Sequence, residues 1–115
     1  MAYAVMITGC TKDGEPLFEL NPVWWWSTDE LMEDDRFTME RETSSYTDYV
    51  ADLDLTNMRA LHEHFRPAAT QGLYADELWQ EDIQPVMKAL DTALYKQARL
   101  YDHFHVLCYE WESGY

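Results

Sequence analysis

The residues best placed to hold a metal ion are His103 and His105, because side chains two apart on a β-strand point to the same side of it. They would lie about 6.6–6.8 Å apart along the strand, with Cys108 on the opposite face. His62 and His64 are about 200° apart on a helix, so both cannot ligate one ion. The chain has no C-x-x-C or H-E-x-x-H spacing. The alternative, that His103 and His105 are ordinary polar residues at a helix–strand junction, is the one we adopt. We therefore predict no metal and no cofactor.

The only thiol nucleophiles are Cys10 and Cys108. Both fall in or at the end of apolar, strand-like segments, where buried and unreactive thiols are the rule. No G-x-S-x-G or Walker-type motif is present, and four glycines leave little material for a phosphate-binding loop. We therefore predict that the protein is not an enzyme and has no catalytic residues.

Carboxylates are the most abundant chemical groups, with 22 acidic against 8 basic residues and a net charge of −14. This balance argues against binding to nucleic acid or to an anionic membrane, since both require positive charge. The segment from residue 28 to residue 54 alone has ten acidic residues and two arginines. Paired carboxylates there could bind a hard cation, but the glycine of an EF-hand loop is missing. Such a charge fits a basic protein partner, and the alternative is that it serves solubility only.

Three consecutive tryptophans precede the acidic segment. If the preceding strand continues through them, Trp24 and Trp26 follow Phe18 and Leu20 onto the inner face. Trp25 would then lie on the other face, beside carboxylates, which is the composition of an interface hot spot. The alternative for Trp25 is packing against a second apolar layer. Pro22 restricts this segment to an edge or a bulge.

Alternating apolar residues predict strands at residues 2–9, 17–20, 37–42, 46–55 and 104–111. In the third of these, Phe37 and Met39 point inward. In the fourth, Asp48, Asp52 and Asp54 share the solvent face.

Helical spacing and capping residues predict a short helix that starts after Ser27 or Thr28 and ends near residue 35, followed by a second at residues 57–65. The second has the apolar stripe Met58, Leu61, His62, Phe65, is capped by Thr56, and should end at Pro67. Helices are also predicted at residues 76–83 and from residue 86 to residue 101. Pro85 either kinks the chain between these two helices or begins the second.

The order of strands, helices and a final strand predicts an α+β fold. We expect a single domain over residues 1–115, with an antiparallel sheet of about four or five strands and two or three helices packed on one face. The N- and C-terminal strands should be adjacent. Two cysteines favour reduced thiols in a cytoplasmic protein, the N-terminus lacks the basic region of a signal peptide, and no apolar window is long enough to span a membrane.

These observations predict a non-enzymatic acidic binding protein that occludes a basic protein partner, either a nuclease toxin or a nucleic-acid-binding protein. In size, acidity and lack of catalytic motifs, the chain is similar to toxin-neutralising immunity proteins and to phage-encoded inhibitors of host nucleases, some of which imitate nucleic acid. The alternatives are a homodimeric assembly module that uses exposed aromatic residues and, less favoured, a metal protein or enzyme built around the two C-terminal histidines. The predicted contact residues are Trp25, Asp29, Glu30, Glu33, Asp34, Asp35, Asp48, Asp52 and Asp54.

Overall fold

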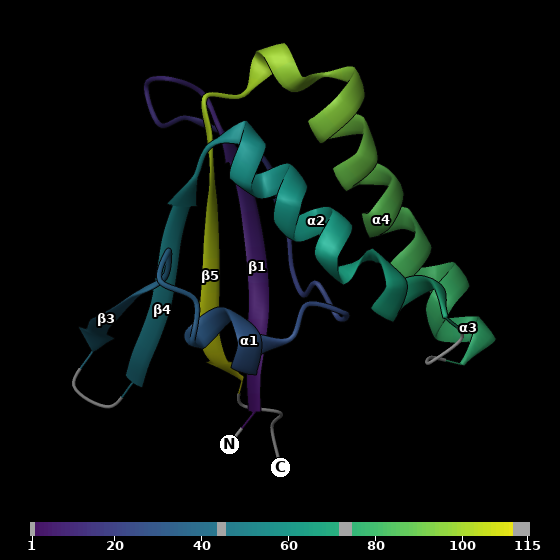
Figure 1. Ribbon diagram of the computed structural model, residues 1–115, viewed down its shortest axis with the longest axis horizontal. Helices are drawn as coiled ribbons and strands as arrows, with labels where there is room; N and C mark the ends of the chain where they lie inside the picture. The colour runs from purple at the N-terminus through teal and green to yellow at the C-terminus, as the bar shows by residue number, and fades with distance from the viewer. Residues whose placement is uncertain (1, 44–45, 72–74, 112–115) are drawn as a thin grey trace.

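Five strands form one antiparallel sheet in the computed structural model, which describes residues 2–43, 46–71 and 75–111 (Figure 1). The strands are β1 (Ala2–Cys10), β2 (Pro16–Leu20), β3 (Thr38–Thr43), β4 (Tyr46–Leu53) and β5 (His103–Trp111). Their spatial order is β2-β1-β5-β4-β3. The first and last strands pair along their whole length, from Ala2 opposite Trp111 to Cys10 opposite His103. The predicted α+β class and the adjacency of the terminal strands are both confirmed.

The helices follow the predicted order. They are α1 (Thr28–Met32), α2 (Leu55–Thr70), α3 (Asp76–Leu78) and α4 (Gln84–Asp91), with π-helical turns η1 (Trp79–Ile83) and η2 (Thr92–Lys96) and the 3-10 turn η3 (Ala98–Leu100). From α3 to η2 the chain is one helical rod, because the residues at each junction keep right-handed helical dihedrals. Pro85 lies in the first turn of α4, directly after a π-helical turn, where its missing amide hydrogen is tolerated.

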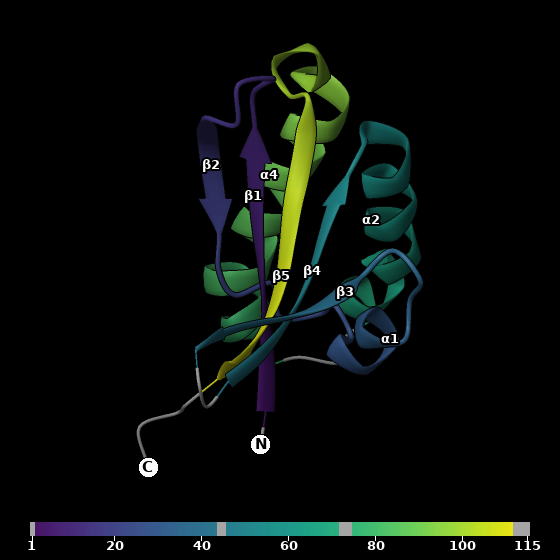
Figure 2. The ribbon, with the colours of Figure 1, turned by 90° about the vertical axis from the view of Figure 1, so that its left-hand side faces the viewer.

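Helices α2 and α4 pack on one face of the sheet, and the core lies between these layers (Figure 2). Alternate residues of the three central strands supply the sheet side of that core, and they include Val5, Ile7, Ala51, Leu53, Phe104 and Val106. The helix side includes the whole stripe predicted for α2, since Met58, Leu61, His62 and Phe65 are all buried. No helix in the described part of the chain is both long and apolar enough to cross a membrane.

Helix α2 is longer at both ends than predicted. It begins after Asp54, whose side chain accepts a hydrogen bond from the Asn57 amide at 2.8 Å, so Asp54 rather than Thr56 is the cap. At the other end it continues through Pro67 to Thr70. Burial of Ala69 against the core stabilises this last turn.

The opposite face of the sheet is not covered by any helix among the described residues. Its side chains come from the alternate positions of the same strands, including Met6, His105, Leu107, Val50 and Asp52. At its edge, β3 extends beyond the helices. Phe37, just before β3, is buried as predicted, whereas Met39 is 66% exposed, so its predicted inward position is wrong.

Candidate functional site

The predicted acidic patch is divided between the two faces of the sheet. Asp29, Glu30, Glu33 and Asp35 are exposed on and just after α1, which packs on the helical side of the sheet through Leu31. Asp48 and Asp52 project from β4 on the opposite face, because they alternate with the core residues Ala51 and Leu53. These acids therefore do not share one surface, as a single contact with a partner would require.

The acids of β4 also differ from the expected solvent-exposed row. Asp48 is only 6% exposed. Asp52 is exposed but lies 2.8 Å from Nδ1 of His105 on the neighbouring strand. Asp54 lies just after the end of β4 and caps α2. The three carboxylates therefore do not form the exposed row that the alternation predicted.

Trp25 is a core residue, 3% exposed, and its predicted exposure is wrong. The segment from β2 to α1 does not continue as a strand. Instead it turns after Val23, whose amide donates to the Val5 carbonyl at 2.9 Å, and the alternation of faces is lost. Trp26 is buried as predicted, whereas Trp24 is 45% exposed instead of buried.

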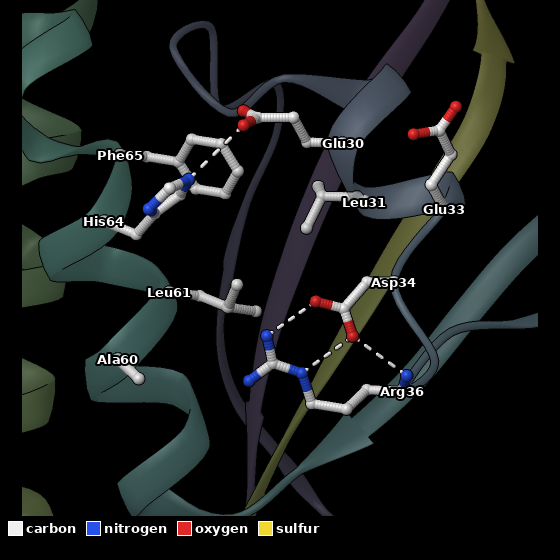
Figure 3. A pocket seen from close by; sticks show the side chains of 9 residues that line it. All are labelled: Glu30, Leu31, Glu33, Asp34, Arg36, Ala60, Leu61, His64 and Phe65. Atoms are coloured by element: carbon white, nitrogen blue, oxygen red, sulfur yellow. Dashed lines mark hydrogen bonds and ion pairs between the residues drawn. The ribbon is translucent and has the colours of Figure 1, made fainter.

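A pocket of about 420 Å³ lies between α1 and α2 and collects three of the predicted acids (Figure 3). Glu30, Glu33 and Asp34 line it from the α1 side. Its apolar lining comes from both helices and consists of Leu31, Ala60, Leu61 and Phe65. The other two lining residues, Arg36 and His64, carry nitrogen donors.

The charges in this α1–α2 pocket are only partly neutralised within it. Arg36 donates to both carboxylate oxygens of Asp34, at 2.8 and 2.6 Å, and these hydrogen bonds lower the pKa of Asp34 to about 2. Arg36 also donates to Asn57 on α2 at 3.2 Å, which ties the two walls together. His64 lies 3.4 Å from Glu30, while Glu33 has no ion pair among the described residues (Figure 3). The rim therefore keeps net negative charge above an apolar lining.

A second polar cluster joins α2 to α4, and the sequence analysis did not identify it. His62 is completely buried, with Nε2 2.8 Å from Asp91 and 2.9 Å from the guanidinium of Arg66. Arg66 also pairs with Glu63 at 3.0 Å and with Asp91 at 2.5 Å. Burial would raise the pKa of Asp91, but hydrogen bonds from Arg66 and His62 outweigh it and hold that pKa below its usual value. The available signal was a histidine on an apolar stripe with an arginine one turn later.

His62, Glu63 and Asp91 place one ligand atom each within 4.8 Å of one another, the spacing of a metal site. The guanidinium of Arg66 contacts all three residues and so occupies the position of an ion. A cation paired to every ligand argues against a metal here. The arrangement is better described as an ion-pair cluster that joins two helices.

His103 and His105 point to the same side of β5, as their spacing predicted, and this side is the open face of the sheet. Each is held by a carboxylate, His103 by Asp102 at 2.9 Å and His105 by Asp52 at 2.8 Å. Neither belongs to a group of three possible ligands in the described ranges. Cys108 is completely buried, and this burial raises its pKa to about 12, which makes it a poor nucleophile.

Comparisons with known proteins add no family to this picture. No protein-family model, no curated protein and no solved structure matches the chain.

Proposed function

We propose that the protein is a non-enzymatic binding protein whose α1–α2 pocket binds a basic segment of a partner protein and so occludes it. The observation that carries the proposal is the composition of the pocket. Glu30 and Glu33 line a space of about 420 Å³ together with apolar side chains from α1 and α2. The net charge of −14 favours association with a basic surface.

A lysine or arginine side chain has the matching chemistry. Its methylene groups can pack on Leu31, Leu61 and Phe65, while its charged head is paired by the glutamates. Asp34 already has a cation in Arg36 and contributes mainly to the shape of the pocket. Glu30 and Glu33 are then the residues that bind the incoming charge.

The proposed contact is narrower than the set of residues predicted from the sequence. Asp29 and Asp35 are exposed near the pocket and would steer a basic partner toward it. Trp25 is excluded because it is buried in the core. Asp48 and Asp52 are excluded because they lie on the opposite face of the sheet.

Basic surfaces that hold phosphate backbones are the partners that such a pocket would occlude. We therefore propose a nuclease or a nucleic-acid-binding protein as the partner, as for immunity proteins or phage inhibitors, and the cytoplasm as the site of action. If the partner is a nuclease, we expect the protein to inhibit it stoichiometrically. Full nuclease activity in the presence of a stable complex would contradict the occlusion.

The test is affinity capture from a lysate of the source organism, using the wild type and a variant with Glu30→Lys and Glu33→Lys. A matched control, Glu77→Lys with Glu81→Lys, makes the same charge change at exposed positions of α3 and η1. We expect the wild type and the control to retain a basic protein, and the pocket variant to retain about tenfold less or weaker. Equal retention by the pocket variant and the control would show that the pocket is not the contact.

The purified complex then gives a second, kinetic readout. Electrostatic steering predicts that the association rate falls as ionic strength rises, and that it falls less steeply for the pocket variant. An association rate that is insensitive to salt would show that the acidic surface does not steer the partner and serves solubility only.

A further inference from the structure

Strand β1 is only partly paired on the side that faces β2. β2 pairs with β1 at Ile7, Thr8, Gly9 and Cys10, and the loop that follows adds one hydrogen bond, from the Val23 amide to the Val5 carbonyl. Nearer the N-terminus, no strand of the described chain pairs with β1 on this side. Residues 2–4 of β1 therefore pair with β5 on one side only.

The direction of the free backbone groups follows from the pairing already present. The Val5 carbonyl points to the β2 side, away from β5. In a strand, backbone groups two residues apart point the same way, so the amide and carbonyl of Tyr3 and the amide of Val5 also point to this edge. Together they form a template for one more strand.

An aromatic pocket of about 320 Å³ lies directly beside this edge. The edge residues Tyr3, Ala4 and Val5 themselves line it. Its other walls come from the loop between β2 and α1, with Pro22, Val23, Trp24, Trp26 and Ser27, and from Thr28 at the start of α1. The pocket is thus adjacent to the backbone groups that could pair with an added strand.

Trp26 is the most deeply buried aromatic residue of the pocket. It lines the pocket but is only 2% exposed, and its indole Nε1 has no hydrogen-bond partner among the described residues. Its ring packs on Phe65, with 5.2 Å between the centroids, and this pair separates the aromatic pocket from the α1–α2 pocket.

The surroundings of the edge are acidic. Glu110 lies opposite Tyr3 on β5, and Asp29 and Glu30 follow the pocket residue Thr28. Burial raises the pKa of Tyr3, and the negative charge of Glu110 raises it further. This potential favours a segment with basic residues and disfavours a second copy of a chain whose net charge is −14.

We propose that the N-terminal half of β1 and the aromatic pocket beside it bind an extended, basic segment of a partner protein as an added β-strand. The segment would exchange backbone hydrogen bonds with Tyr3 and place an apolar or aromatic side chain among the tryptophans. This site goes beyond the proposed function, because it uses a different surface and neutral hydrogen bonds. Either site can be refuted without the other.

The experiment uses a defined probe, the peptide Ac-Lys-Val-Phe-Val-Lys-NH2, titrated into isotopically labelled protein and followed by NMR. The control peptide Ac-Lys-Pro-Phe-Pro-Lys-NH2 keeps the charges and the phenylalanine but loses two amide donors. We expect the first peptide to shift the amide signals of Tyr3, Val5 and Val23, and the control to bind about tenfold more weakly. Equal affinity of the two peptides would overturn the proposal.

Two variants test the protein side of the same hydrogen bonds. Tyr3→Pro removes the ring and one backbone amide, which points away from β5, so the sheet should tolerate it as edge strands do. Tyr3→Val removes the ring and keeps the amide. We expect Tyr3→Pro to bind the first peptide about five- to tenfold more weakly than Tyr3→Val. Equal affinities would overturn the proposal, and if Tyr3→Pro does not fold, the comparison of the two peptides decides. A wild-type dimer that Tyr3→Pro converts to a monomer would identify a second copy as the occupant and refute a partner segment.

Discussion

Removal of Trp25 should destabilise the fold far more than removal of its neighbour Trp24. The two residues are adjacent in the chain, but Trp25 is 3% exposed and Trp24 is 45% exposed. The same comparison separates the core position found here from the interface position that the sequence pattern indicated. Trp25→Ala and Trp24→Ala are therefore the informative pair of variants.

The magnitude follows from the buried area. A buried tryptophan removes roughly 200 Å² from water, worth about 5 kcal/mol. Such a truncation also leaves a cavity, and measured values for large aromatic residues are about 3–5 kcal/mol. Trp24 buries about half as much, worth about 2.5 kcal/mol, and its truncation leaves no closed cavity. We expect the two free energies of unfolding to differ by about 2 kcal/mol or more, a large part of the 5–15 kcal/mol typical of a domain.

Urea unfolding at 25 °C, followed by far-UV circular dichroism, measures both values without relying on tryptophan fluorescence. Trp25→Phe is the control. Since Nε1 of Trp25 has no hydrogen-bond partner in the described part of the chain, its loss leaves no acceptor there unpaired, and this variant should be much milder than Trp25→Ala. Equal costs for the two alanine variants, or a larger cost for Trp24→Ala, would refute the assigned packing.

Three further perturbations test other parts of the structure. Asp91→Asn should lower the free energy of unfolding by about 1–2 kcal/mol in thermal melts. Its effect should not be additive with that of Arg66→Met, because the two side chains are paired, and additive effects would contradict the ion-pair cluster. The pKa of Asp34 is about 2 in the folded protein and 3.8 for the free group, so its ion pair with Arg36 stabilises the fold above pH 3.8. This contribution is about 1 kcal/mol after allowance for solvent screening, and it is lost as the pH falls through 2. Acid unfolding of Asp34→Asn should lack this component, and a curve identical in shape to that of the wild type would show that the pair contributes nothing. Gly9→Ala places a Cβ in steric conflict with the ring of Phe18 and should cost about 1–3 kcal/mol in urea unfolding, with partial relief by Phe18→Leu. A neutral effect would refute this close approach.

Local periodicity was sufficient to predict most of the strands and helices of the fold. The alternation in β1, β4 and β5 follows directly from burial against helices on one side. The stripe of α2 identified four residues that are all buried. These patterns are reliable because each depends on a repeat within one element. Pro67 misled the prediction because the core contact of Ala69 stabilises a turn that the local rule disfavours.

Composition and short-range pattern by themselves determined the fold class, the strong negative charge and the absence of a catalytic motif. Only the tertiary structure decided which charges act together, because the two faces of a strand lie on opposite sides of the sheet. It divided the carboxylates of α1 from those of β4 and brought Glu30 and Glu33 to a pocket that apolar side chains of α2 also line. It also left residues 2–4 of β1 with no pairing strand of the described chain on the side opposite β5, beside an aromatic pocket. It also made Trp25 buried and Trp24 exposed, the reverse of the prediction. The reason is that a turn at Val23, held by one hydrogen bond to Val5, ends the alternation that defines inner and outer residues.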